Sequence, residues 1–180
     1  MDIIIKGEIN SLTIDGKEYI LKETPKKNSK KNLADEMLKH EGVKEYNGIV
    51  ETIQRWYYNG SFVKMPWCAT ALSYFANVCG LEKQIGKHEN VDRLKDFMKK
   101  NKAIHMSHLY GGSYTPKKGD VIFFSSKHIY ADCTHVGTVV SVKGDLVEWI
   151  GGNTSDSIKR KTNNLKKDKY VVCFGEVDYS

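Results

Sequence analysis

Three residues of different types could together carry out nucleophilic catalysis: Cys68, His135 and Asn153. Cys68 follows Pro66 and Trp67 at the head of an apolar run with helical spacing. A thiol at a helix N-terminus is favoured as thiolate by the helix dipole and by unpaired backbone N–H groups. His135 opens an extended apolar run 67 residues later, and Asn153 follows after another 18 residues. The order cysteine, histidine, asparagine predicts a catalytic triad.

Each member of this triad has a defined chemical role. A cysteine that attacks an amide carbonyl needs a base for its proton, a group that orients the base, and donors for the oxyanion. We expect His135 to be the base, Asn153 to accept from one imidazole nitrogen, and backbone amides near Cys68 to hold the oxyanion. Two alternatives stay open for the third member, since Asn153 could be a simple turn residue and Glu148 could hold the imidazolium more strongly.

Several aromatic and amide side chains could complete the site. Gln54 or one of Tyr57 and Tyr58 could add a side-chain oxyanion donor. Trp67 and Trp149, with the two tyrosines, could wall a substrate groove, although packing in the core is an equally good explanation for each aromatic residue.

No metal or cofactor is expected. The four cysteines are scattered without paired close spacing, which is typical neither of a disulfide framework nor of a zinc knuckle. His105 and His108 lack a third ligand in the sequence. We therefore expect free thiols and catalysis by side chains alone.

The elements that must position the triad fall into two halves. Helical spacing and end signals predict helices near residues 33–38, 49–56, 68–79 and 91–98, with Asn32 as a cap and Gly80 as a terminus. Beyond Pro116 the pattern becomes extended, and strands are expected at 121–124, 136–142, 146–150 and 171–174. Helices followed by a meander of strands indicate an α+β domain with an antiparallel sheet packed against the Cys68 helix.

The N-terminal segment has a different character. Ile3 to Ile5 and two further short apolar runs, with Asp15 and Gly16 as a turn, predict a small β-hairpin. A lysine-rich stretch with Pro25 follows as a linker, so we divide the chain into residues 1–31, hairpin and basic linker, and 32–180, the catalytic domain. The basic stretches 22–31 and 159–169 are interpreted as solvated loops.

Composition limits the class of protein. The chain has 180 residues, 40% of them hydrophobic, which suits one globular domain. It opens with an acidic residue and short apolar runs, so we expect no signal peptide and no membrane span. A net charge of +6 favours an anionic partner such as nucleic acid, a membrane surface or bacterial wall polymers, and charge alone does not choose among them.

The motifs resemble one known family. They are Trp67, Cys68 and Ala69 at a helix start, residues 118–124 (KGDVIFF), His135, Val136 and Gly137, and residues 151–155 (GGNTS). Over residues 33–156 this is similar to the CHAP domain, a cysteine, histidine-dependent amidohydrolase/peptidase of papain-like fold. The resemblance implies cleavage of peptidoglycan amides with Cys68 as nucleophile, His135 as base and Asn153 as orienting residue.

The sequence departs from the family pattern in two places. Many members have an acidic residue two positions before the asparagine, where this chain has Gly151. Some phage members bind calcium through aspartates just before the cysteine, whereas residues 59–67 contain no carboxylate, and we expect no calcium site.

The resulting hypothesis is a peptidoglycan hydrolase, either an N-acetylmuramoyl-L-alanine amidase or an endopeptidase, acting as a phage or prophage lysin. We expect a monomer that is made in the cytoplasm, acts on the bacterial cell wall, and binds neither nucleic acid nor membrane. One alternative is a papain-like protease or deamidase effector that acts on protein. Another is an inactive module that binds wall glycan through its aromatic residues.

Overall fold

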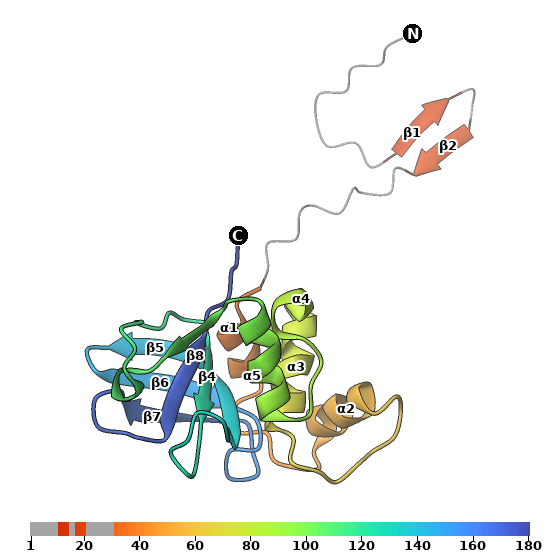
Figure 1. Ribbon diagram of the computed structural model, residues 1–180. Helices are drawn as coiled ribbons and strands as arrows, with labels where there is room; N and C mark the ends of the chain where they lie inside the picture. Colours follow the sequence, from red (N-terminus) through yellow and green to blue (C-terminus); the bar gives the residue numbers. More distant parts are fainter. Residues whose placement is uncertain (1–10, 15–16, 21–30) are drawn as a thin grey trace.

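The computed structural model describes residues 11–14, 17–20 and 31–180 of the chain. Helices lie on one face of a six-stranded antiparallel sheet (Figure 1), and helical segments precede most of the strands along the chain. The expected α+β architecture is confirmed. None of the described helices is both long enough and apolar enough to cross a membrane.

The helices begin and end close to the expected positions. They are α1 (Leu33–Leu38), α2 (Gly48–Tyr57), α3 (Cys68–Val78), α4 (Glu82–Ile85), α5 (Val91–Lys100) and the 3-10 helix η1 (His108–Tyr110). The Asn32 side chain accepts from Ala34 N at 3.1 Å and so caps α1. Gly80, with φ of 73°, follows α3 in the left-handed region that glycine tolerates best. The short helices α4 and η1 are not among the elements predicted from the sequence.

The sheet has the strand order β3-β8-β4-β5-β6-β7. Its strands are β3 (Ile104–Met106), β4 (Val121–Phe124), β5 (His135–Lys143), β6 (Leu146–Gly151), β7 (Lys159–Asn164) and β8 (Val171–Gly175). The four expected strands are present as β4, β5, β6 and β8. A separate antiparallel pair, β1 (Ser11–Ile14) and β2 (Lys17–Ile20), confirms the predicted hairpin pairing, while its turn and residues 3–5 lie outside the described residues.

The interpretation of residues 159–169 as a solvated loop is wrong for their first half. Residues 159–164 form β7, which pairs with β6 from Lys159 opposite Gly151 to Asn164 opposite Leu146. The strand contains no large apolar residue, so periodicity could not reveal it. Lysine and arginine are nevertheless common on edge strands, where charge blocks pairing with another chain.

The two faces of the sheet carry separate clusters of buried side chains. Leu72 and Phe75 of α3 pack with Val136 and Ile150 of the sheet in the larger core. Ile122, Phe124 and Trp149 belong to a smaller cluster that contains none of these residues. Because side chains alternate along a strand, Val136 faces the helices and His135 faces the second cluster.

Two polar residues fasten the ends of the domain. The Asp120 carboxylate ties the turn before β4, because it accepts from Lys117 N at 2.7 Å and from Val177 N at 3.1 Å. The Tyr179 hydroxyl donates to Gly119 O at 3.0 Å and accepts from Leu33 N at 3.2 Å. The last residues are thereby joined to the start of α1.

Candidate active site

Cys68 is the first residue of α3, at the position that the sequence predicts. Trp67 precedes it as the helix cap without a side-chain cap hydrogen bond. The N–H groups of the first helical turn therefore have no helical acceptor, as is general at helix N-termini. The Cys68 residue is only 5% exposed. These amides surround a sulfur that is almost entirely shielded from water.

The expectation that Cys68 is a thiolate near neutral pH is corrected by its burial. Burial raises the pKa of the Cys68 thiol above its ordinary value, although the backbone N–H groups of Ala69, Val136 and Cys68 itself act in the opposite direction. Removal of water from the charged sulfur outweighs the favourable backbone dipoles. At neutral pH Cys68 is therefore a neutral thiol.

His135 is the first residue of β5, and its ring is held from two sides. Its Nε2 lies 3.1 Å from Thr154 Oγ1, and its centroid lies 5.6 Å from that of the Trp149 ring and 6.0 Å from that of Phe124. Burial, together with the smaller effect of the positive charge of Lys161, lowers the pKa of His135 to about 4. The imidazole is therefore neutral at neutral pH and can accept a proton.

Cys68 lies beside the start of β5, the strand that opens with His135. The backbone N–H of Val136, directly after His135, is one of the groups that favour the Cys68 thiolate. In the described part of the chain, no hydrogen bond joins this sulfur to the imidazole, whose Nε2 contacts Thr154 instead. Nδ1, the ring nitrogen bonded to Cγ, is the one that the Thr154 contact leaves available. Catalytic hydrogen bonds of this kind often form only when substrate is bound.

Asn153 reaches the expected region with a different set of contacts. It leaves β6 through Gly151 and Gly152 with φ of 54°, and it lines a surface cavity together with His135. Its side-chain amide makes no hydrogen bond to the imidazole among the described residues. The residue that contacts His135 Nε2 is the next one along the chain, Thr154.

Glu148, the alternative third member, is turned away from His135. Its carboxylate accepts from Ser141 Oγ at 3.4 Å and pairs with Arg160 at 3.4 Å. The neighbouring residue Trp149 contacts the His135 ring, and consecutive side chains of a strand point to opposite faces. The strand period therefore excludes Glu148 from the site.

The groove candidates are dispersed. Trp149 lines the cavity that contains His135. The expectation that Trp67 walls a groove is wrong, because this residue is 0% exposed and packs where a side chain at Gly152 would lie. Gln54 is buried, and its amide donates to Met65 O at 3.3 Å, three residues before Cys68. The Tyr57 hydroxyl donates to the Glu89 carboxylate. The Tyr57 ring, at the end of α2, packs against the ring of Tyr58, which caps that helix.

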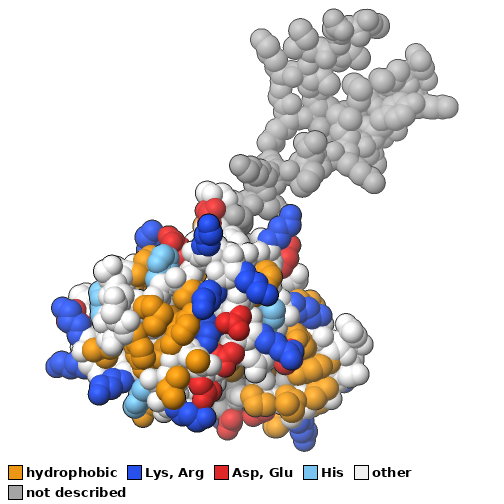
Figure 2. Space-filling model, viewed as in Figure 1, with side chains coloured by type: hydrophobic (Ala, Val, Ile, Leu, Met, Phe, Trp, Pro, Cys, Tyr) orange, Lys and Arg blue, Asp and Glu red, His pale blue; other side chains and the backbone are white. Residues whose placement is uncertain are grey.

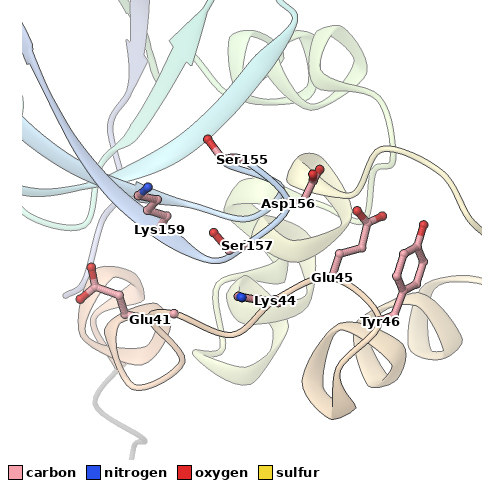
Figure 3. Close-up of a pocket in the computed structure, with 9 residues that line it drawn as sticks. Glu41, Lys44, Glu45, Tyr46, Ser155, Asp156, Ser157 and Lys159 are labelled. Carbon is pink, nitrogen blue, oxygen red and sulfur yellow. The ribbon is translucent and has the colours of Figure 1, made fainter.

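Two surface cavities adjoin at the loop after β6. The first contains His135, Asn153, Thr154 and Lys161 among its lining residues. The second lies between residues 41–46 and 155–159 (Figure 3), which are joined by Glu45 N to Asp156 O at 2.7 Å. Ser155 lines both cavities. The second cavity offers both charge signs, and its charged residues are Glu41, Lys44, Glu45, Asp156 and Lys159.

Two site residues were missed from the sequence. Thr154 is 3% exposed, and Lys161 lies on β7, which was not expected to be a strand. Because Thr154 directly follows Asn153, its position could have suggested a place in the site. Threonine is common in turns, however, so the residue type alone does not indicate such a role. No cluster of three or more histidine, cysteine or acidic side chains suited to a metal occurs among the described residues.

Comparisons with known proteins bear on the same segment. A family model described as the CHAP domain matches residues 57–153, more than half of the chain. The matched span includes Cys68 and His135 and ends at Asn153. No curated protein matches the sequence.

Among solved structures, one described as "The crystal structure of Ly7917 with the hydrolyzing product of MDP" is 16% identical, with a TM-score of 0.38. The alignment covers 61% of this chain and 53% of that chain. The present chain therefore spans about half the length of that protein.

Proposed function

Because the protein belongs to the CHAP domain family, we propose that it is a peptidoglycan hydrolase that cleaves an amide bond by cysteine nucleophilic catalysis. The observation that carries the proposal is the placement of Cys68 at an uncapped helix N-terminus beside the start of the strand that opens with His135. The net charge of +6 suits an anionic wall polymer.

The first half-reaction begins from two neutral groups. As the Cys68 sulfur attacks the amide carbon, His135 Nδ1 takes the thiol proton, so no ion pair has to exist beforehand. The carbonyl oxygen becomes an oxyanion, for which the backbone N–H groups of Cys68 and Ala69 are the proposed donors. The imidazolium then protonates the leaving amine as the carbon–nitrogen bond breaks, which leaves a thioester on Cys68.

The second half-reaction regenerates the enzyme. His135 removes a proton from a water molecule, whose oxygen attacks the thioester carbon. The carbon–sulfur bond breaks, the sulfur recovers the proton from His135, and the acyl product leaves as a carboxylic acid. Each turnover consumes one water molecule and releases one new amine and one new carboxyl group.

The substrate bond is either the N-acetylmuramoyl-L-alanine bond or a peptide bond of the stem or cross-bridge. The mixed-charge cavity in Figure 3 adjoins the His135 cavity through Ser155 and offers carboxylates and lysines to a zwitterionic peptide. We infer that a phage or prophage lysin is the setting, and that the protein acts as a monomer.

The test is digestion of purified peptidoglycan, followed by identification of the new amine terminus. Release of L-alanine amino groups indicates an amidase, and another new amine indicates an endopeptidase. We expect Cys68→Ala and His135→Ala to abolish release. Cys79→Ala is the matched control, because Cys79 is a buried free thiol beside the opposite end of α3.

The outcome against the proposal is equally clear. If peptidoglycan from several bacterial species stayed intact while the Cys68 thiol was shown to be free, peptidoglycan would be excluded as the substrate. New amine termini in protein digests alone would favour a protease or deamidase. Retention on wall polymer without any cleavage would favour a binding module.

A further inference from the structure

We propose that Thr154 is the residue that orients the histidine base, through the hydrogen bond between its hydroxyl and His135 Nε2. This inference rests on the proposed function for its kinetic consequences, and on the described contacts for its structural ones. The two atoms are 3.1 Å apart, and Thr154 is 3% exposed. A buried hydrogen bond of this length fixes the direction of a ring that could otherwise rotate.

The hydroxyl is held in place by the turn around it. Thr154 N donates to Ser157 O at 2.9 Å, and Ser157 Oγ donates back to Thr154 O at 3.0 Å. The backbone of Thr154 is thus fixed on both sides. Asn153, by contrast, shares the cavity and makes no side-chain hydrogen bond to the imidazole in the described part of the structure.

Gly151 leaves the space that this arrangement requires. A Cβ atom built on Gly151 would lie 3.2 Å from Thr154 Oγ1, 3.0 Å from the Trp149 ring and 3.0 Å from Val136 O. Contacts this short would force neighbouring atoms to move, and the hydroxyl is one of those neighbours. The absence of a side chain at Gly151 therefore allows the Thr154 hydroxyl to stay within hydrogen-bond distance of His135 Nε2.

The contact also selects which nitrogen is available for chemistry. When Thr154 Oγ1 accepts from Nε2–H, Nδ1 carries the lone pair and is the nitrogen left available to act as a base. A hydroxyl is neutral, so it orients the ring without adding the negative charge that would raise the pKa of the imidazole. Thr154 is a positioning residue that acts through His135.

The test compares Thr154→Val, which removes the hydroxyl at nearly constant volume, with Thr154→Ser, which retains it. We expect Thr154→Val to lower kcat roughly ten- to a hundred-fold with little change in KM, because a misdirected base slows the chemical step without weakening ground-state binding. Thr154→Ser should restore most of kcat. Gly151→Ala should lower kcat in the same direction by displacing the hydroxyl.

A matched control separates this effect from the general loss of a buried hydroxyl. Thr138 is also buried on β5, and its hydroxyl donates to Asp120 O at 3.1 Å, away from the ring. We expect Thr138→Val to retain the kcat of the unmodified protein. Equal losses of kcat in Thr138→Val and Thr154→Val would overturn the proposal.

A spectroscopic readout makes the result independent of the proposed reaction. The ring ¹⁵N chemical shifts of His135 report its tautomer, and we expect the Nε2–H form in the unmodified protein and in Thr154→Ser, with loss of that preference in Thr154→Val. An unchanged tautomer or an unchanged kcat in Thr154→Val would refute the assignment. Failure of the unmodified protein to cleave peptidoglycan would instead refute the proposed function, and the ¹⁵N shifts alone would then decide the role of Thr154.

Discussion

At the residue scale, the proposed chemistry starts from a thiol and an imidazole that are both neutral at neutral pH. Burial raises the pKa of Cys68 and lowers that of His135 to about 4. The two shifts share their largest cause, since removal of water disfavours the charged form of either group. Proton transfer during attack, rather than a preformed thiolate, is the mechanism that fits this electrostatic state.

The first prediction concerns pH. The base works only when it is neutral, so kcat/KM should fall as pH drops below the His135 pKa of about 4 and should remain level through mildly acidic pH. An unperturbed histidine would give the same fall near pH 6.5. The measurement is the pH profile of amine release from soluble wall fragments.

Lys161 provides the control for this prediction. Its positive charge opposes protonation of His135, so Lys161→Met should raise the His135 pKa and move the acidic limb to higher pH. Lys143→Met removes the same charge at the far end of β5 and should leave the limb in place. If the acidic fall of kcat/KM stayed at the same pH in both variants, a group other than His135 would be responsible for it.

Sequence reasoning located Cys68 and His135 because each stands at the boundary of a clear apolar pattern. It did not find Thr154, whose role depends on the fold of the turn at residues 153–157 and on space left by Gly151. For Trp67, the sequence left groove and core as equal alternatives, and the structure places the side chain in the core.

At the element scale, α5 fastens the segment that leads into the site. Lys95 is 2% exposed, and its ammonium contacts Asp92 at 2.6 Å and Tyr130 O at 2.5 Å. Asp92 in turn accepts from Cys133 N at 3.0 Å, two residues before His135. A helix thus holds the connection between β4 and β5 through one buried charge.

The second prediction follows from this contact. Lys95→Met should lower the free energy of unfolding by about 3 kcal/mol, because it leaves the buried carbonyl of Tyr130 and the Asp92 carboxylate without their partner. Lys100→Met, at the exposed end of α5, should change it by less than about 0.5 kcal/mol. Denaturant titration followed by tryptophan fluorescence measures both. Equal free energies of unfolding in the two variants would show that the Lys95 contacts do not stabilise the connection between β4 and β5.

The third prediction concerns the contact between α3 and the loop after β6. A Cβ atom on Gly152 would lie 2.6 Å from Ala71 Cβ and 2.7 Å from the Trp67 ring. Gly152→Ala should therefore destabilise the protein by about 1–3 kcal/mol through overpacking and should reduce activity by shifting the start of α3. Gly48→Ala is the control, because nothing lies within 4 Å of a Cβ at that position.

Periodicity predicted the elements that carry a buried apolar stripe and missed those that do not. The helices α1, α2, α3 and α5 and the strands β4, β5, β6 and β8 each bury apolar residues at regular spacing. The edge strand β7 is made of lysine, arginine, threonine and asparagine, so it has no apolar period in the sequence. It is recognised as a strand by its pairing with β6. Short elements such as α4 and β3 contain too few residues for a period to be read.

At the scale of the whole molecule, positive and negative side chains are mixed on the face seen in Figure 2. Figure 2 shows lysine and arginine side chains distributed over the viewed face, with acidic side chains among them. A dispersed charge favours general attraction to an anionic polymer over a defined nucleic-acid groove. The composition gave the sign of the charge, and only the structure gives its distribution.

The fourth prediction tests the proposed division of the chain at residue 31. Every residue of the two described cores lies between Leu33 and Val177. A protein that begins at Lys31, and so retains the Asn32 cap, should keep the denaturant midpoint of the full chain and its kcat on soluble wall fragments. A lower midpoint would show that the preceding residues belong to the same cooperative unit.

The hydroxyl of Tyr179 also has an implication for modularity. By bonding to both Leu33 N and Gly119 O, it brings the entry and the exit of the folded body to one flank (Figure 1). A unit whose two ends are neighbours can be inserted into a larger polypeptide as a cassette, with fused partners tethered at a single corner.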